Sequence, residues 1–374
     1  MSRHNPTFRD LLTPRIQNVE TLWCYSVATA ESLTQTLPNF PRSMPNLRSL
    51  QLGRVVDEPI WDSSTDPFEP FPNTMKSLTL YDIPLYPSFY GLGTLTKLVL
   101  HYYNVRPPLE AFLDLLEGNC SLEHADLMIL FDAPLTPISH RRDVIMNRLQ
   151  HLAITCWDAV VAQTMVSSIP LQKGVRLVIT FYDEDTGLGL NDILSGISTT
   201  HPLNLASPTS MEYWSFPREI HLVGPNGSFL YHHEWRGHGL FQRDPFMEFP
   251  VLPLTNVREL RLVHSEPPVV FYPSSFPALE TLTIERNTDL SHLFCALLNP
   301  SLSPSPSLET LEFRDCILTE EFMEELTRFA SDRRNTTSAW LRRVVIGPRD
   351  GKFPTADSIR RLGEHVPTIV DVLT

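Results

Sequence analysis

One apolar pattern, apolar-x-x-apolar-x-apolar, recurs ten times in this chain of 374 residues and constrains its fold more than any other feature. Six copies lie between Val19 and Ile154 and four between Val257 and Ile346, at intervals of 20 to 33 residues. The last two apolar residues of each copy stand two apart, so they lie on one side of a short strand. A single strand of this kind cannot bury its apolar face, whereas stacked copies can. The sequence therefore predicts an α/β solenoid with a parallel sheet, grown by repetition.

Every copy of the pattern starts on an apolar residue. The starting positions are Val19, Leu47, Met75, Leu95, Leu122, Leu149, Val257, Leu279, Leu308 and Leu341. Two weaker candidates begin at Val175 and Ile220. Two copies add a polar fourth element, Asn287 and Cys316, and we expect this side chain to be buried and to bond with backbone groups where the chain leaves the strand. The signature resembles that of leucine-rich repeats, which implies a curved solenoid with a concave parallel sheet and helical or irregular return legs.

The return legs are expected to be helical wherever proline permits. Helical periodicity favours helices at 28–37, 108–116, 143–149, 159–168, 291–298 and 356–364. After Cys316, Thr319 is a plausible N-cap for a helix that places Phe322, Leu326 and Phe329 on one face. The chain has 33 prolines, and the proline-rich legs at 58–74 and 83–93 are expected to be extended or to form single turns, because proline lacks the N–H and fixes φ.

Residues 202–253 interrupt the repeat. The stretch is rich in aromatic residues and histidine, and GPNGS at 224–228 between two apolar runs predicts a hairpin, which we expect to project from the solenoid as an insertion. His232, His233 and His238 suggest a metal site, and with it a remote alternative function, a metal-dependent hydrolase. Their H-E-x-x-x-H spacing is one residue longer than H-E-x-x-H, so a histidine cluster in a loop is the preferred interpretation.

Motifs for nucleophilic catalysis and phosphate binding, such as G-x-S-x-G and G-x-x-x-x-G-K-[ST], do not occur in the sequence. We therefore expect a protein that is not an enzyme, with no catalytic residues, no cofactor and no metal. The 43 acidic and 30 basic side chains leave a net charge of −13, which argues against a nucleic-acid partner. Nowhere in the sequence do eighteen apolar residues run together, so we expect no membrane partner. The five cysteines form no C-x-x-C pair, which fits reduced thiols better than disulfides or a zinc site. These features favour a location in the cytoplasm or nucleus.

Two stretches carry a resemblance to a known family. Phe276-Pro277-Ala278-Leu279-Glu280-Thr281-Leu282 and Met44-Pro45-Asn46-Leu47-Arg48-Ser49-Leu50 resemble the repeats of the large fungal F-box/leucine-rich-repeat families, and the resemblance extends over about Pro14 to Thr374. In those families the solenoid recruits a target protein. An N-terminal F-box, in turn, docks onto a cullin-RING ubiquitin ligase through its adaptor. The resemblance thus implies a substrate-recognition role in ubiquitin transfer.

The N-terminal segment, residues 1–18, departs from the family because it shows no helical-hairpin pattern, and we expect it to contain no F-box. Residues 19–374 are expected to form the solenoid. A ubiquitin-ligase adaptor is then a partner only if an F-box is supplied elsewhere. The alternative is a stand-alone scaffold or inhibitor of another protein, with no link to ubiquitin.

The strand alternation also predicts which surface binds the partner. If the repeat leucines face the core, the intervening side chains face the open concave sheet. They include five basic and five acidic groups together with aromatic residues and histidines, a mixture that suits a protein partner of unknown identity. The predicted contact residues are Trp23, Tyr25, Tyr81, Lys97, His101, His124, Asp126, His151, Arg176, His221, Glu259, Arg261, Glu285, Glu312 and Arg314.

Overall fold

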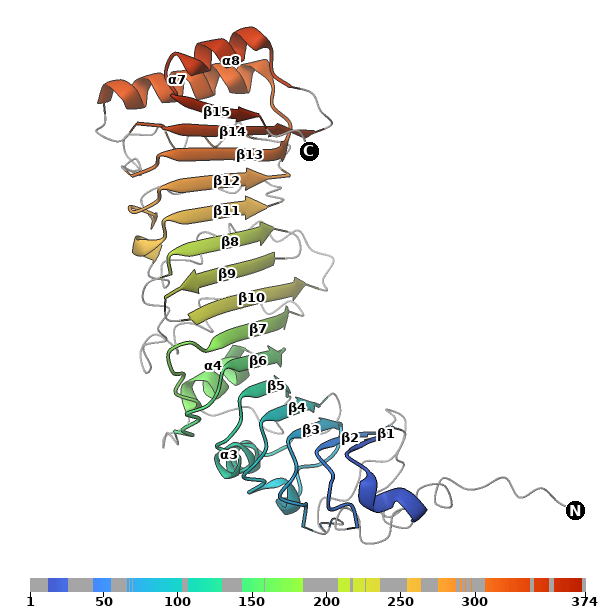
Figure 1. Cartoon of the computed structure of the whole chain (residues 1–374). Helices are drawn as coiled ribbons and strands as arrows, with labels where there is room; N and C mark the ends of the chain where they lie inside the picture. Colours follow the sequence, from blue (N-terminus) through green and yellow to red (C-terminus); the bar gives the residue numbers. More distant parts are fainter. Residues whose placement is uncertain are drawn as a thin grey trace, which may run out of the picture. The chain divides into compact units, whose positions relative to one another are not determined.

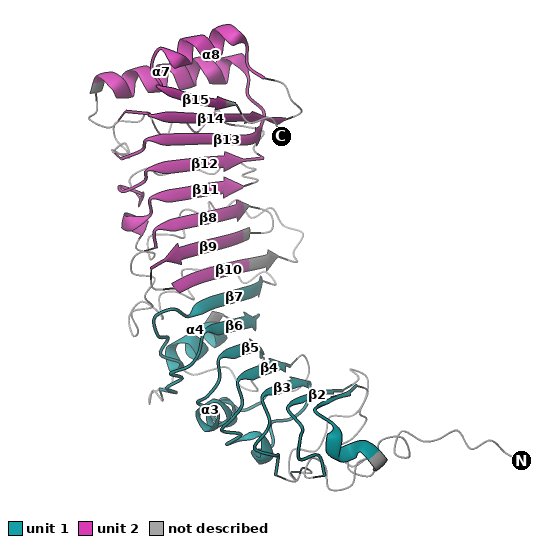
Figure 2. Cartoon of the chain, in the orientation of Figure 1, with its two compact units in different colours: residues 1–182 teal, residues 183–374 magenta. Residues whose placement is uncertain are grey.

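A computed structural model divides the chain into two compact units, residues 1–182 and 183–374, coloured separately in Figure 2. We describe each unit by itself. The residues that the structure describes are 13–25, 43–54, 66, 68, 70–102, 107–129, 143–157, 159–183, 208–215, 218–225, 227–235, 254–263, 275–286, 290, 293, 297, 307–336, 340–349 and 353–371.

Unit 1 is a parallel sheet whose strands follow one another in chain order (Figure 1). The strands are β1 (Thr21–Cys24), β2 (Ser49–Gly53), β3 (Ser77–Tyr81), β4 (Lys97–His101), β5 (His124–Met128), β6 (His151–Cys156) and β7 (Arg176–Asp183). Adjacent strands are in register so that the three apolar residues of one copy of the pattern, here called its triplet, align with those of the next copy. Leu50, for example, pairs with Leu78, and Leu78 pairs with Leu98. The predicted strands, including the weaker candidate at β7, are therefore confirmed, and each copy of the pattern contributes one strand.

The repeated apolar residues form the core of unit 1. Leu50, Leu80, Leu98 and Leu127 have no exposed surface, and the first residue of a copy, such as Leu47, is also buried beneath the strands. The legs behind the sheet contain the 3-10 helix η2 (Pro87–Phe89) and the α-helices α3 (Leu109–Gly118) and α4 (Ala159–Ser168), and a further 3-10 helix, η1 (Thr13–Asn18), precedes β1. The helices at α3 and α4 and the single turn at η2 agree with the sequence prediction.

Aromatic side chains fill the space behind β2 and β3, where the legs are not helical. Phe68, Phe71, Tyr86 and Phe89 are buried, and their ring centroids lie 5.3 to 6.0 Å apart. Rings of this size supply the buried apolar area that a helix would otherwise supply. The prolines of these legs are thus compatible with a closed core.

The predicted helix at 143–149 is wrong. No helix is present there; Val144 and Met146 are buried while Ile145 between them is 62% exposed. This alternation has the period of an extended chain, and the Val144 N–H donates to the Ser168 carbonyl at 2.8 Å. The predicted helix at 28–37 lies outside the described residues, as does most of that at 291–298.

Helix α3 packs unusually close to the preceding leg. A Cβ added to Gly118, the last residue of α3, would lie 2.6 Å from the backbone nitrogen of Gly91, which itself has φ +73°. Directly after the helix, the buried Asn119 side chain donates to the carbonyls of Phe89 (3.1 Å) and Leu115 (2.7 Å). The close approach of Gly118 to Gly91 and the hydrogen bonds of the Asn119 amide therefore hold α3 against the leg that contains η2.

Unit 2 is a mixed sheet. Its strands are β8 (Ser210–Ser215), β9 (Arg218–Gly224), β10 (Gly227–Trp235), β11 (Glu259–Val263), β12 (Thr281–Glu285), β13 (Thr310–Cys316), β14 (Arg343–Pro348) and β15 (Thr368–Asp371). From β11 to β15 they are parallel and follow chain order, and the spatial order before β11 is β10, β9, β8 (Figure 1). Strand β15 was not predicted from the sequence.

The hairpin predicted at GPNGS is present, but it does not project from the sheet. Strands β9 and β10 pair antiparallel across a turn between Gly224 and Gly227, β9 pairs antiparallel with β8, and β8 pairs parallel with β11. Both strands place apolar side chains in the core, among them Leu222, Phe229 and Tyr231. Such a hairpin buries its apolar face by extending the sheet, which is why it lies within it.

The legs of unit 2 are the 3-10 helix η5 (Leu254–Asn256) and the helices α7 (Glu320–Thr336) and α8 (Ala356–Gly363), which pack on each other. The N-cap prediction is confirmed, since the Phe322 N–H donates to Thr319 Oγ1 at 3.1 Å. Phe322, Leu326 and Phe329 are buried as expected. None of the helices in the described part of the chain is long and apolar enough to cross a lipid bilayer.

A residue with left-handed backbone recurs at or near the end of three strands. Asp82, Arg286 and Asp315 have φ between 53° and 58°, and each stands two residues after the last apolar residue of its triplet. Next to Asp315, the buried Cys316 thiol contacts the carbonyls of Ile284 (3.4 Å) and Arg314 (3.3 Å), as predicted for the fourth repeat element. Asn287 lies outside the described residues.

Candidate protein-binding surface

The face of each sheet opposite the legs, here called the outward face, carries all fifteen predicted contact residues. Nine of them are in unit 1 and six in unit 2, each at a position where the strand alternation turns the side chain away from the core. The structure thus brings them together as two separate sets, one on each unit.

In unit 1 the dominant feature is an aromatic strip formed by Trp23, Tyr25, Tyr81 and His101. Trp23 is 65% exposed and Tyr25 57% exposed, the largest exposed fractions among the Trp, Tyr and Phe side chains of the described residues. The Tyr25 and Tyr81 rings lie 6.4 Å apart, and Tyr81 meets His101 edge-on at 5.2 Å. The sheet therefore exposes the Trp23 and Tyr25 rings to water, beside the partly buried rings of Tyr81 and His101.

Gly53 explains how Tyr25 reaches Tyr81. A Cβ at Gly53 would lie 3.0 Å from Tyr25 Cδ1 and 3.7 Å from Tyr81 Cβ, so the missing side chain leaves the place that the Tyr25 ring occupies. Gln51 Nε2 also donates to the Tyr25 hydroxyl. Sequence reasoning missed Gly53, although a glycine inside a strand pattern is itself a signal of close approach.

Next to the strip lies a cationic row formed by Lys97, His124, His151 and Arg176. These four residues are in register on the consecutive strands β4 to β7. Lys97, His124 and Arg176 are exposed, His151 is partly buried, and the two imidazole rings lie 6.1 Å apart. The neighbouring Asp126 approaches His101 at 3.6 Å on the other side.

The row affects its own protonation. Burial lowers the pKa of His151 below its ordinary value, and the charges of Arg176 and His124 lower it further, while Asp126 acts in the opposite direction. The folded protein therefore binds a proton at His151 less readily than the unfolded chain. The free energy of unfolding is expected to fall as the pH decreases below about 6.5 toward the folded-state pKa.

Arg176→Gln should raise the pKa of His151 toward its ordinary value, because it removes an adjacent positive charge. The measurement is an NMR titration of the histidine side-chain resonances. Lys173→Gln serves as the control, since Lys173 is an exposed cation of the same unit in the turn before β7. An unchanged His151 pKa in Arg176→Gln would show that the row is not electrostatically coupled.

The outward face of unit 2 is different, because its charges pair with one another. Arg261 donates to Glu212 at 3.1 Å and to Glu285 at 2.5 Å, and Arg314 donates to Glu312 at 2.7 Å. Glu312 is only 9% exposed. Partial burial acts to lower the pKa of Arg261. Hydrogen bonds to Glu285 and the charges of Glu212 and Glu285 nevertheless raise this pKa above its ordinary value.

These ion pairs change the role expected of two predicted contact residues. The Glu285 and Glu312 side chains are 14% and 11% exposed, so they are better placed to hold Arg261 and Arg314 than to touch a partner. Glu212, the other partner of Arg261, was not predicted, because the sequence assigned residues 202–253 to a projecting insertion. His221 and Glu259 remain partly or fully exposed.

The histidine cluster proposed for metal binding is only partly described. His232 lies in strand β10, and its Nδ1 is 2.7 Å from Glu219 Oε1; His221 Nε2 lies 3.4 Å from Glu219 Oε2. His238 and the His233 side chain lie outside what the structure describes. Within its described residues, no group of three or more His, Cys, Asp or Glu side chains is arranged to hold a metal ion.

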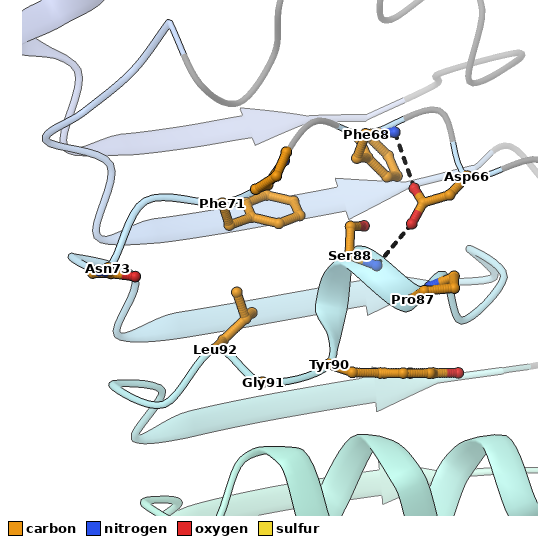
Figure 3. Close-up of a pocket in the computed structure, with 10 residues that line it drawn as sticks. Asp66, Phe68, Phe71, Asn73, Pro87, Ser88, Tyr90, Gly91 and Leu92 are labelled. Atoms are coloured by element: carbon orange, nitrogen blue, oxygen red, sulfur yellow. Dashed lines mark hydrogen bonds between the residues drawn. The ribbon is translucent and has the colours of Figure 1, made fainter.

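A hollow of about 430 Å³ lies among the legs of unit 1, beside η2 (Figure 3). Its acidic residue, Asp66, accepts hydrogen bonds from the backbone N–H groups of Phe68 (3.0 Å) and Ser88 (2.7 Å). One carboxylate oxygen thus bonds within its own leg, and the other joins that leg to η2. This arrangement explains the hollow as part of the fold.

Comparisons with models of known protein families and with curated proteins find no match to this chain. Its function must therefore be inferred from the side chains of its own surfaces. Among the described surfaces, the outward face of unit 1 is the one that combines exposed rings with unpaired charge.

Proposed function

We propose that this chain is a non-enzymatic leucine-rich-repeat solenoid that recognises another protein in the cytoplasm or nucleus. We further propose that it resembles the substrate-binding part of an F-box-type ubiquitin-ligase receptor. The parallel strands, one for each copy of the repeat, support the solenoid. The ligase link is supported by the sequence resemblance alone.

The observation that carries the recognition role is the exposure of Trp23 and Tyr25. Tryptophan and tyrosine dominate the binding energy of protein interfaces because they bury large areas at low entropic cost. Here the two side chains stand on consecutive outward positions at β1, and Gly53 and Gln51 hold the Tyr25 ring in place. A preformed pair of rings is what a binding anchor requires.

Quantitative affinity purification from the native cells tests this role. The variant Trp23→Ala with Tyr25→Ala should lose the specific partner by about tenfold or more. The matched control is Trp340→Ala, which removes a 49% exposed tryptophan next to Arg334 in unit 2. Recovery of the same partners at the same level by both variants would contradict the proposed surface.

The ligase link needs a separate measurement. The product of the complete transcript should be purified from cells and probed for the cullin adaptor. Recovery of the adaptor in equal amounts with the chain supports a receptor. Its absence, with the target protein still bound, favours the alternative of a stand-alone scaffold or inhibitor and leaves the recognition role intact.

A further inference from the structure

The cationic row of unit 1 stands out because basic side chains outnumber carboxylates on the same surface. At the outward positions of β4 to β7, over residues 97–101, 124–128, 151–155 and 176–182, the one carboxylate is Asp126. Asp126 approaches His101. No ion pair joins Lys97 or Arg176 to an acidic group in the described part of the chain.

This arrangement is unfavourable until an anion is present. Like charges held side by side on neighbouring strands destabilise each other. Burial is the main cause of the lowered pKa of His151, and the charges of Arg176 and His124 lower it further. In unit 2, by contrast, the arginines of the outward face are matched by glutamates at 2.5 to 3.1 Å. The chain as a whole is strongly acidic, with a net charge of −13, so an uncompensated cationic row is a local exception.

We propose that the cationic row of Lys97, His124, His151 and Arg176 binds an acidic, extended segment of the protein partner, next to the aromatic strip. The proposal rests on the recognition function argued above and assigns a chemical class to the partner. Carboxylates of the segment would accept hydrogen bonds from the row and be attracted by its positive charge. An apolar or aromatic side chain of the same segment would pack on Trp23 and Tyr25.

The dimensions of the row match such a segment. Neighbouring strands lie ~4.8 Å apart, so four strands carry the row over ~14 Å. In an extended peptide, alternate side chains point the same way at intervals of ~6.7 Å, so three of them span ~13 Å. A segment with acidic residues at three alternate positions, running across the strands, would therefore cover the row from Lys97 to Arg176.

A peptide fits these observations better than a nucleic acid. A polyanion that extends beyond the row would meet the repulsion of a chain with net charge −13, whereas a short acidic segment meets only the row. The exposed rings at β1 also lie three strands before Lys97, where a folded or extended peptide can place one apolar side chain.

Binding of such a segment should be linked to the protonation of His151. A bound carboxylate stabilises the imidazolium form, so the pKa of His151 should rise on binding, against the effects of Arg176 and His124 and in the same direction as that of Asp126. Affinity is therefore expected to increase as the pH falls from 8 to 6 and to decrease with added salt.

Selection from a random peptide library, displayed on phage and using the full chain as bait, tests the proposal directly. The selected peptides should be enriched in Asp and Glu at alternate positions. Their affinity, measured with synthetic fluorescent copies, should drop by about tenfold or more in Lys97→Gln with Arg176→Gln. The matched control, Arg148→Gln with Lys173→Gln, removes the same residue types from exposed turns of unit 1 and should change affinity less than twofold.

Three results would overturn the proposal: recovery of peptides without acidic enrichment, equal affinity for both double variants, or tighter binding of single-stranded oligo(dT) than of the selected peptides. The native partner separates this failure from that of the recognition function. If the Trp23→Ala, Tyr25→Ala variant loses the partner and the Lys97→Gln, Arg176→Gln variant retains it, recognition stands and the acidic segment is wrong.

Discussion

Replacing Phe313 by alanine is expected to lower the free energy of unfolding of unit 2 by about 3–5 kcal/mol. Phe313 is the last apolar residue of its triplet, in β13, and has no exposed surface. Its ring meets Phe322 of α7 edge-on, with centroids 5.0 Å apart and planes at 83°. The substitution therefore removes a large buried side chain, an aromatic pair and a contact that joins the sheet to its longest helix.

Urea unfolding followed by circular dichroism measures the effect, and hydrogen exchange of the β12 to β14 amides locates it in unit 2. Ile317→Ala is the matched control, because Ile317 lies four residues further along and is 45% exposed. We expect a change below about 0.5 kcal/mol for the control. Equal destabilisation by both substitutions would mean that Phe313 does not occupy the core position described.

Gly118→Ala should destabilise unit 1 by about 1–3 kcal/mol, although alanine is the better helix former. The added Cβ would lie 2.6 Å from the backbone nitrogen of Gly91, so α3 or the leg that contains η2 must move. That movement would also strain the hydrogen bonds of Asn119 to Phe89 and Leu115.

Thermal unfolding compared with Gly93→Ala isolates the steric cause. Gly93 belongs to the same leg, but a Cβ there would meet nothing within 4 Å, and its φ is not in the left-handed region. The control should be neutral or more stable by up to about 1 kcal/mol. A stabilising Gly118→Ala substitution would show that helix propensity prevails and that the contact with Gly91 is looser than described.

The repeat was predictable because burial repeats with it. In each copy the last two apolar residues, such as Leu78 and Leu80, lie on the same side of the strand because side chains alternate along it. This one rule predicted the strands of unit 1 and β11 to β14 of unit 2. The N-cap at Thr319 and the packing of Cys316 were also predictable, since both follow from short-range geometry around a single polar side chain.

The errors came from segments whose periodicity is ambiguous. Residues 143–149 contain enough apolar residues for a helical face, but only tertiary packing selects the extended alternation in which Val144 and Met146 are buried. The hairpin of β9 and β10 was recognised from its turn, yet whether it projects or joins the sheet depends on the free edge that β8 supplies.

By itself, the sequence determined one strand for each copy of the repeat and the set of side chains on the outward face, because both depend only on the period-two alternation of a strand. Tertiary structure decided which of those side chains meet. Register aligns Lys97 with His124, His151 and Arg176 as an unpaired row, and pairs Arg261 with Glu212 and Glu285. Cross-strand neighbours come from distant parts of the chain, so their charges add or cancel only once the strands are aligned.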